Sequence, residues 1–524
     1  MAMILSSLAA PQNWPAGVLI LVLILVISLT TITMVVPRYP ARPAWPSRAP
    51  KALSGWPVLG CLGFFRNRWS FIRKHTSTSP SGQFSFFYGP HFIVALSGAA
   101  ARQTFFTSRS LDLNEGYVFS PQSMLTIVEQ TSFAALFSAT PSIEHFHEGE
   151  GTLASHFTRL FKCFTRESRL EVVLSDLVRD CVSSYEDMDI SAPLDPFDAL
   201  YRLVYKLTLR TLGSKDVAEN SKLLDETLEI FTTLDGSSAL EVMFPKIPFP
   251  SKLNKMWAGT KLHWIFSKIM QDRRTSGRVE HDAMQALMDA GEGDIIISAF
   301  IMAALFAGLN NTTVNAAWIL LFLGKNKEWY QKIRDEVDAS IAKHRCSDEE
   351  TRADVLSRLT LAECEQEFPL IGLCLRESIR LTMPGSTFRK NISGKDVKIG
   401  NSEEVIPKDC FAIYPIADIH LDPDIYPDPH TWDPSRYLPE RAEDKKTSHA
   451  YVGWGTGLHP CLGKRFAKLE ITICIAMFFA FFDCQVADEK GNTENVKLPP
   501  INHNNICSKR QPGHTWLKCR RRVS

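Results

Sequence analysis

The chain has 524 residues, of which 45% are hydrophobic and 22% are charged. A chain of this length and composition buries one or two large cores and is neither a disordered tail nor a disulfide-stapled miniprotein. Basic and acidic residues number 58 and 57, for a formal net charge of +1, so no global charge favours nucleic acid as a partner. The twelve cysteines include no C-x-x-C pair, which argues against a zinc ribbon and favours reduced, mostly buried thiols.

The first segment with a clear signature is an uncharged, strongly apolar run over residues 16–36. Residues 1–37 contain no Asp, Glu, Lys, Arg or His. Because a helix rises about 1.5 Å per residue, the run is long enough to span the ~30 Å hydrocarbon core of a bilayer. We therefore expect a transmembrane anchor over 16–36, preceded by a lumenal segment over 1–15. A cleaved signal peptide and a buried helix are the alternatives, but a basic start and a clear cleavage site are both lacking.

Charge and proline content predict the orientation of this anchor and the nature of the segment behind it. Every charged residue from Arg38 to Arg109 is basic, and the first acidic residue is Asp112. The positive-inside rule therefore places the C-terminal part in the cytosol, with some of the basic stretch against membrane lipid. Prolines recur every few residues over 37–51, which favours a stiff extended linker. Residues 52–524 are then expected to form one large domain.

Helical patterns dominate the middle of that domain. Within the helical region from 150 to 345, residues 295–323 are nearly uncharged and predict a central helix buried on all sides. Residues 326–342 are charged and amphipathic and predict a surface helix. A short apolar stretch after Cys461 predicts a last buried helix rather than a second membrane span.

Strand patterns are few and short. Residues 82–97 carry aromatic and β-branched runs on either side of Gly89-Pro90, which predicts a hairpin. Residues 380–437 are rich in Pro, Gly and Asp and predict turns and short strands. The expected fold class is therefore mainly α with small β-sheets.

The segment with the strongest chemical signature surrounds Cys461. Gly453, Gly455 and Gly457 precede this cysteine, Gly463 follows it, and an apolar helix begins directly afterwards. The dipole and free N–H groups of a helix N-terminus stabilise a thiolate. A lone thiolate held in this way is a nucleophile or a soft metal ligand, and a glycine-rich turn around a buried cysteine is the alternative.

The residues from Trp454 to Gly463, WGTGLHPCLG, resemble the haem-binding loop of the cytochrome P-450 family, Phe-x-x-Gly-x-x-x-Cys-x-Gly. Trp454 stands where the family has Phe, and every other fixed element is present. The resemblance implies a haem b (iron protoporphyrin IX) whose axial ligand is the Cys461 thiolate. The further cofactor-binding residues that it implies are Trp454, Gly455, His459, Gly463 and Arg389, with Arg389 and His459 near a haem propionate.

Three more segments resemble the family in the family's order. Glu377 and Arg380 match Glu-x-x-Arg and share one helix face. Arg436, in Trp-Asp-Pro-Ser-Arg-Tyr, matches the arginine of an aromatic-x-Pro-x-Arg-aromatic motif. The resemblance implies that these three side chains form a buried network that braces the cysteine loop, and buried ions persist only when mutually satisfied. The third segment, Pro384-Gly385-Ser386-Thr387-Phe388-Arg389, resembles the strand that follows the Glu-x-x-Arg helix in the family. The entry segment Trp56-Pro57-Val58-Leu59-Gly60 also resembles the family.

The central helix departs from the family on the side where oxygen binds. The family has Ala/Gly-Gly-x-acid-Thr-Thr, whereas this chain has Ala307-Gly308-Leu309-Asn310-Asn311-Thr312. Because neither amide titrates, we expect proton delivery to run through Asn311, Thr312 and ordered water, with Asn310 in the place of the acid. The alternative is that these are helix-interior polar residues satisfied by water or by carbonyl groups.

The resemblance implies a membrane-anchored haem-thiolate monooxygenase that inserts oxygen from O2 into a lipophilic substrate. We expect a terpenoid or sterol-like substrate, an NADPH-dependent flavin reductase as electron donor, and a single-pass location in the endoplasmic reticulum membrane. The alternatives are an isomerase or dehydratase on the same fold that uses a peroxide or epoxide without a reductase, and a non-catalytic haem carrier or sensor. The residues expected to line the substrate pocket are Phe306, Ala307, Ser386, Thr387 and Phe388.

Overall fold

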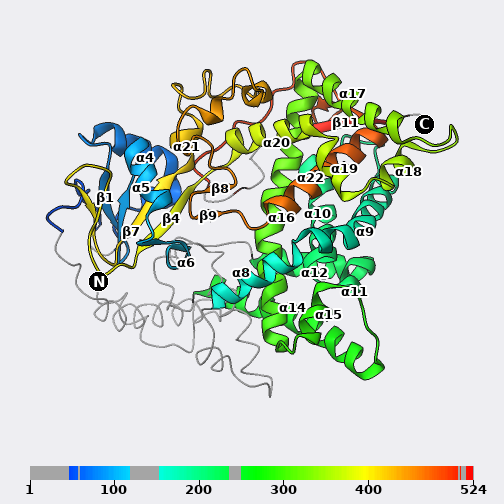
Figure 1. Cartoon of the computed structure of the whole chain (residues 1–524), viewed down its shortest axis with the longest axis horizontal. Helices are drawn as coiled ribbons and strands as arrows, with labels where there is room; N and C mark the ends of the chain where they lie inside the picture. Colours follow the sequence, from blue (N-terminus) through cyan, green and yellow to red (C-terminus); the bar gives the residue numbers. More distant parts are fainter. Residues whose placement is uncertain are drawn as a thin grey trace, which may run out of the picture.

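Figure 1 shows a computed structural model of the chain, which describes residues 46–56, 59–117, 153–234, 249–505, 508 and 515–522. The predicted lumenal segment 1–15 and the predicted anchor 16–36 lie outside the described residues, as does the linker 37–51 up to residue 45. These three predictions therefore remain predictions.

A helical body makes up most of the described chain, as predicted (Figure 1). The bounds of its elements follow from the backbone hydrogen bonds. The helices are α3 (Gly63–Arg66), α4 (Arg68–Thr78), α5 (Ala99–Thr107), α6 (Leu113–Tyr117), α8 (Leu153–Phe164), α9 (Glu167–Glu186), α10 (Pro196–Leu212), α11 (Lys215–Glu219), α12 (Ser221–Leu234), α14 (Pro250–Ser276), α15 (Ala283–Asp289), α16 (Asp294–Lys325), α17 (Lys327–His344), α18 (Arg352–Ser357), α19 (Leu361–Gln366), α20 (Pro369–Thr382), α21 (Ile416–His420) and α22 (Lys464–Phe481), with the 3-10 helices η5 (Pro434–Tyr437) and η6 (Glu443–Lys445).

The long helix α16 runs through the helical body and confirms the predicted central helix (Figure 1). It packs against α10, α14, α20 and α22. Among the described residues, α16 is the one helix that is long and apolar enough to cross a membrane. However, 83% of its most apolar stretch is buried inside the protein. Its apolar surface therefore serves the core. The next helix, α17, buries one face and exposes the other, which confirms the predicted surface helix.

A five-stranded sheet with the order β1-β2-β7-β4-β3 lies at the other end of the molecule (Figure 1). The predicted hairpin is confirmed: β1 and β2 pair antiparallel, and Gly89 in the turn has a φ of 56°. Strand β7 is parallel to β2 and antiparallel to β4, so segments far apart in the sequence share one sheet. The strands are β1 (Phe84–Tyr88), β2 (His91–Ala95), β3 (Leu111–Asp112), β4 (Ser386–Asn391), β5 (Val397–Lys398), β6 (Val405–Ile406), β7 (Phe411–Pro415), β8 (Gly455–Thr456), β9 (His459–Pro460), β10 (Phe482–Ala487) and β11 (Trp516–Arg521).

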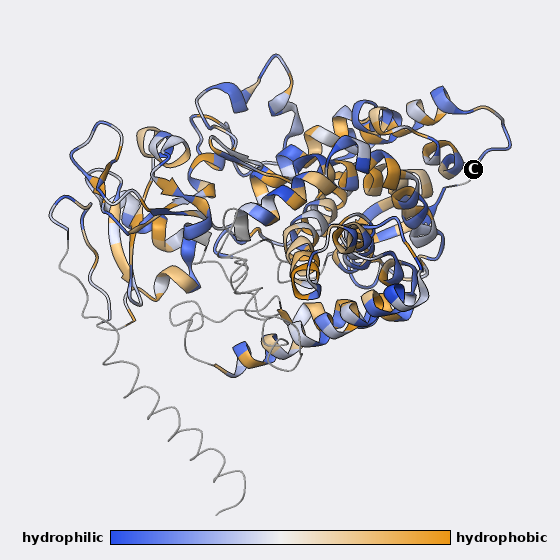
Figure 2. Ribbon diagram, turned by 60° about the horizontal axis from the view of Figure 1, so that its bottom comes forward, coloured by the Kyte–Doolittle hydropathy of each residue, from blue (hydrophilic) through white to orange (hydrophobic). Residues whose placement is uncertain are grey.

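Hydrophobic residues gather on the strands and the inner helices, whereas the peripheral loops are mainly hydrophilic (Figure 2). The largest apolar cluster joins α9, α10, α16, α20 and α22, and two smaller clusters cover the two faces of the sheet. The eleven cysteines within the described residues are all free thiols, as the lack of close cysteine pairs predicted.

Candidate functional site

Cys461 lies between a tight hairpin and the start of α22. Strands β8 and β9 pair antiparallel with Gly455 opposite Pro460, and the Cys461 N–H donates to the carbonyl of Trp454 at 2.7 Å. Gly455 has a φ of 65°, and a Cβ there would stand 2.5 Å from the carbonyl oxygen of His459. Larger residues do not fit this turn, so glycine is required for the hairpin that presents the thiol.

The thiol is partly accessible, and two backbone donors face it from the helix N-terminus. Desolvation raises the pKa of the Cys461 thiol, although the N–H groups of Gly463 and Lys464 and the Lys464 charge oppose the rise. The two donors still favour the anion, and a bound metal ion deprotonates a coordinating thiol outright.

The structure brings Glu377, Arg380 and Arg436 together in one fully buried cluster. Both oxygens of the Glu377 carboxylate accept from Arg380, at 2.7 and 2.8 Å, and Arg436 Nε donates to the same carboxylate at 3.2 Å. The Tyr437 hydroxyl and the Asp433 N–H also donate to it, each at 3.0 Å. A buried carboxylate with this many donors is fully compensated, so each partner is costly to remove.

The two arginines extend this cluster to the surrounding backbone. Arg380 Nη1 donates to the carbonyl oxygens of His420 and Pro429, at 2.6 and 2.8 Å. Arg436 Nη1 donates to the Pro427 carbonyl at 2.5 Å and pairs with Glu443 at 2.9 Å. The cluster thus fixes α20, η5 and the loop between α21 and η5 as one unit.

Two basic side chains meet beside the cysteine hairpin, Arg389 from β4 and His459 from β9. Burial and then the Arg389 charge lower the pKa of the His459 imidazole, while Asp112 opposes them. Arg389 is buried, with its guanidinium 5.0 Å from the centroid of the Phe105 ring. Because the lowered pKa favours the neutral imidazole, Arg389 supplies the positive charge here and His459 supplies a ring nitrogen that can hydrogen-bond an acidic group.

The centre of α16 has two exposed positions among residues that are otherwise buried or half-buried. Ala307 and Asn311, one helical turn apart, are exposed on a helix that is otherwise almost entirely buried. Asn310 is half-buried, and its Nδ2 has no partner among the described residues. The Asn311 carbonyl accepts from Asn315 Nδ2 at 2.7 Å, which is the carbonyl bonding expected of a polar residue inside a helix.

Thr312 lies instead beside a carboxyl group that the sequence did not single out. Glu470 of α22 is fully buried, the Thr208 hydroxyl donates to its Oε1 at 3.4 Å, and side-chain hydrogen bonding from Thr208 and Thr312 opposes the effect of burial on it. Burial prevails and holds the pKa of Glu470 well above its usual range, which favours the protonated, neutral form of the side chain. Gly308 permits this arrangement, because a Cβ there would stand 3.2 Å from Thr208 Cγ2. The sequence has Asn310 in the place of the family's acid and predicted proton delivery through Asn311, Thr312 and water, and no sequence signal distinguishes Glu470 from an ordinary helix residue.

The residues predicted to line the substrate pocket do not all lie together. Phe306 is buried, with its ring 4.8 Å from that of Phe231. Ser386 and Thr387 are half-buried at the start of β4. Phe388 packs against Phe64 in the apolar cluster of α3, α4, β1 and β2. Side chains alternate along a strand, so Phe388 and Ser386 point away from the face of β4 that carries Thr387 and Arg389.

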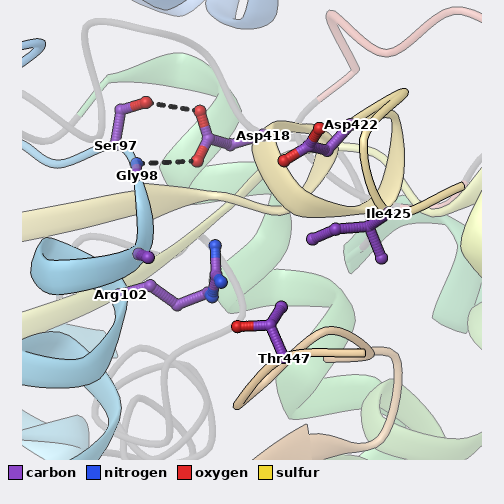
Figure 3. A pocket seen from close by; sticks show the side chains of 8 residues that line it. Ser97, Gly98, Arg102, Asp418, Asp422, Ile425 and Thr447 are labelled. Atoms are coloured by element: carbon purple, nitrogen blue, oxygen red, sulfur yellow. Dashed lines mark hydrogen bonds between the residues drawn. The ribbon is translucent and has the colours of Figure 1, made fainter. Parts of the chain in front are cut away.

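A surface pocket of about 370 Å³ lies apart from these residues, between α5 and the segment that follows β7 (Figure 3). Asp418 accepts from the Ser97 hydroxyl at 2.5 Å and from the Gly98 N–H at 3.2 Å, so it caps the start of α5. None of the predicted site residues lines this pocket. The pocket therefore contributes nothing to the cysteine site.

Comparison with known proteins agrees with this geometry. A sequence profile described as Cytochrome P450 matches residues 50–504. The chain belongs to the cytochrome P450 family. It is 30% identical over 441 residues to "Cytochrome P450 monooxygenase AacuE" of Aspergillus aculeatus, covering 83% of this chain and 86% of that protein. It is also 29% identical over 328 residues to a sterol 14-demethylase of Arabidopsis thaliana, covering 59% of this chain and 64% of the relative.

A solved P450 structure, "Retinoic acid bound cyanobacterial CYP120A1", matches with a TM-score of 0.66 at 21% identity. The match covers 91% of this chain and all of that one, and it shows the fold. The predicted family, fold class and haem cofactor with a cysteine thiolate ligand are therefore confirmed. The chain is a cytochrome P450 monooxygenase, an enzyme that takes dioxygen, a lipophilic substrate and a redox partner.

The residues of the cysteine hairpin fit a haem. Cys461 offers an accessible sulfur at a helix N-terminus, and beside it lie the Arg389 guanidinium and the His459 imidazole, a charge and a hydrogen-bonding group of the kind that binds propionates. A Cβ on Gly463 would meet no atom within 4 Å, so this side of the hairpin is open to a flat ligand. Soft sulfur with nearby cations is the donor set that an iron porphyrin requires.

Proposed function

We propose that Cys461 is the iron ligand and that the protein oxygenates a terpenoid or sterol-like substrate of specialised metabolism. The observation that carries the proposal is the placement of Cys461 at the junction of hairpin and helix, beside the buried cluster of Glu377, Arg380 and Arg436. When bound, haem supplies the activation of dioxygen. The protein supplies orientation, access and protons.

The roles of the surrounding side chains follow from their chemistry. Arg389 holds the acidic edge of the cofactor through its charge, and His459 through a hydrogen bond from its ring. On the opposite helix, Asn311 is exposed and can bind water, while Thr312 connects α16 to the neutral Glu470. We assign proton movement to this polar group, with Asn310 as a neutral neighbour that cannot titrate.

The proposed substrate class rests on the apolar residues at the centre of α16 and on the proteins that this chain resembles. Phe306 and Ala307 present hydrocarbon at the centre of α16, and Thr387 adds a hydroxyl group from the face of β4 that also carries Arg389. Such a mixture suits a large apolar ligand with few polar groups. The resemblance to a sterol 14-demethylase supports a substrate of similar shape, and the resemblance to fungal P450 monooxygenases supports oxygenation as the reaction.

A flavin reductase that draws on NADPH is the proposed electron donor. Two exposed lysines, Lys464 and Lys468, follow Cys461 on the first turns of α22, and the apolar Leu458 and Leu462 beside them are also exposed. A basic surface with an apolar centre is complementary to an acidic partner and permits close approach to the haem edge.

A location on the endoplasmic reticulum membrane, with the catalytic domain in the cytosol, is the proposed setting. One face of α14 exposes Trp257 and Trp264, with ring centroids 5.5 Å apart, and the intervening Lys261 is also exposed. Tryptophan and lysine on one exposed face suit a bilayer interface. Phe249, just before α14, packs against the apolar cluster that includes Leu59 and Leu62, so this face begins close to the segment behind the predicted anchor.

The decisive experiment replaces Cys461 by serine. We expect the reduced carbon monoxide complex of the wild type to show the far-red Soret band of a thiolate-ligated haem, and the variant to lose both that band and turnover. Persistence of pigment and turnover in Cys461→Ser would overturn the proposal. NADPH consumption with reductase and a sterol-like substrate separates the monooxygenase from an isomerase that needs no reductase and from a haem carrier without turnover.

A further inference from the structure

His420 is the last residue of α21 and lies fully buried between the charged cluster and the cysteine hairpin. It stands in none of the motifs described above. We propose that His420 is a positioning residue for Cys461, whose imidazole fixes the peptide from which the cysteine hairpin starts. The inference rests on the proposed function, because it takes Cys461 to be the iron ligand.

The contact that carries the inference is a hydrogen bond from the backbone of Val452 to the ring. The Val452 N–H donates to His420 Nε2 at 3.0 Å. The Val452 carbonyl accepts from the Gly455 N–H at 3.0 Å, and the Val452 side chain is buried. Both polar groups of this residue are therefore fixed, one by His420 and the other by the hairpin itself.

The backbone hydrogen bonds of the hairpin link the position of Val452 to that of Cys461. Gly455 begins β8, which pairs with β9, and the Trp454 carbonyl accepts the Cys461 N–H at 2.7 Å. Because the hairpin is so short, a shift of its first residue moves both strands and the sulfur together. His420 thus acts on Cys461 through Val452 and Gly455.

The backbone of His420 is fixed from the other side. Its carbonyl oxygen accepts from Arg380 Nη1 at 2.6 Å, and Arg380 is held in turn by Glu377. The His420 ring stacks on that of Tyr451, with centroids 5.2 Å apart and planes 27° apart, and the Tyr451 hydroxyl donates to the Arg376 carbonyl at 3.1 Å. One residue therefore joins the charged cluster to the cysteine hairpin.

The neutral state of the His420 ring allows Nε2 to accept the hydrogen bond from Val452 at all times. Since Nε2 accepts, the proton of the neutral ring is on Nδ1. Burial, the Arg380 charge and His503 lower the pKa of His420, to about 3, although a hydrogen bond involving the Arg380 backbone raises it. The ring therefore stays neutral, and Nε2 remains able to accept from the Val452 N–H.

Three variants of the full-length membrane protein test this role. The Gln side chain reaches as far as Nε2 and offers an acceptor there, whereas the Asn side chain reaches only as far as Nδ1, and Leu offers no acceptor. We expect His420→Leu and His420→Asn to lower the ratio of thiolate-type to thiol-type carbon monoxide complex about fivefold, the effect of one lost hydrogen bond. His420→Gln should retain most of the wild-type ratio. His430→Leu, at an exposed position of the same segment, is the matched control.

A second measurement reports on the hairpin without the haem signal. Hydrogen–deuterium exchange of the peptide that contains Val452 should accelerate in His420→Leu and remain slow in His420→Gln. A wild-type spectrum and unchanged exchange in His420→Leu would overturn the inference. Equal loss in His420→Gln and His420→Leu would also overturn it, because a packing role does not depend on the acceptor. A wild-type protein without a thiolate band would instead overturn the proposed function.

Discussion

The thiolate side and the oxygen side of this protein are stabilised in opposite ways. On the thiolate side, the Glu377 carboxylate accepts from two arginines, a tyrosine and a backbone amide, and the arginines also bind neighbouring carbonyls. On the oxygen side, polar atoms near the centre of α16 lack partners among the described residues: Asn310 Nδ2, Thr313 Oγ1 and Glu470 Oε2.

This difference separates a part that must stay still from a part that exchanges protons. A compensated ionic cluster is costly to rearrange, so it keeps the sulfur at a fixed position. Unpaired polar atoms each cost about 1–3 kcal/mol and are natural binding points for water. The neutral Glu470 belongs to this second group, since a protonated carboxyl can donate where Asn310 cannot titrate.

The largest effect should follow from removing the charge at the centre of the thiolate side. Glu377→Gln leaves Arg380 buried without its counter-ion and Arg436 with Glu443 alone, so we expect a loss of about 3–5 kcal/mol in the free energy of unfolding, with loss of haem. Urea denaturation and the pigment content of purified protein measure both. Glu328→Gln breaks an exposed pair with Lys332 and should change stability by less than about 1 kcal/mol. Equal effects of the two substitutions would show that the thiolate side is not specially stabilised.

A smaller effect concerns the start of α20, the helix that carries Glu377. Glu336 accepts from the N–H groups of Leu370 and Ile371, at 2.7 and 3.2 Å, and burial raises its pKa to about 7 although these hydrogen bonds oppose the rise. A raised pKa in the folded state gives stability below the unfolded value of 4.5, and this stability is lost as the pH rises towards 7. Relative to Glu336→Gln, the wild type should therefore lose about 2 kcal/mol between these pH values. A constant difference between the two proteins across this range would contradict the assignment.

Sequence reasoning predicted the elements better than the contacts between them. The charge-free pattern of α16, the hairpin around Gly89 and the glycines before Cys461 are local signals, because each depends on neighbouring residues alone. The pairing of β2 with β7 and the junction of Thr208, Thr312 and Glu470 join residues far apart in the chain, and single-sequence patterns carry no such distances.

The types of the site residues were also predicted better than the directions in which their side chains point. The motif around Arg389 was used to place Phe388 in the substrate pocket, although alternation along β4 sends these neighbours to opposite faces. His420 and Glu470 resemble ordinary core and helix residues in sequence. Their roles depend on burial and on partners that only the fold supplies.

The smallest predicted effect tests how closely α10 and α16 meet on the oxygen side. In an open helix Gly→Ala stabilises by about 1 kcal/mol, but a Cβ on Gly308 would stand 3.2 Å from Thr208 Cγ2 and 3.3 Å from its Oγ1. Thr208 cannot move freely, because it is buried, β-branched and hydrogen-bonded to Glu470. Gly308→Ala should therefore destabilise by about 1 kcal/mol. Thr208→Ser removes the methyl group and keeps the hydroxyl, so in that background the same substitution should become neutral or stabilising, as thermal denaturation of the four proteins would show. A destabilisation of the same size in both backgrounds would mean that the Thr208 methyl group does not limit how closely α10 and α16 approach each other. The packing of these two helices would then be as loose as the hydrogen bonding of the polar atoms on the oxygen side.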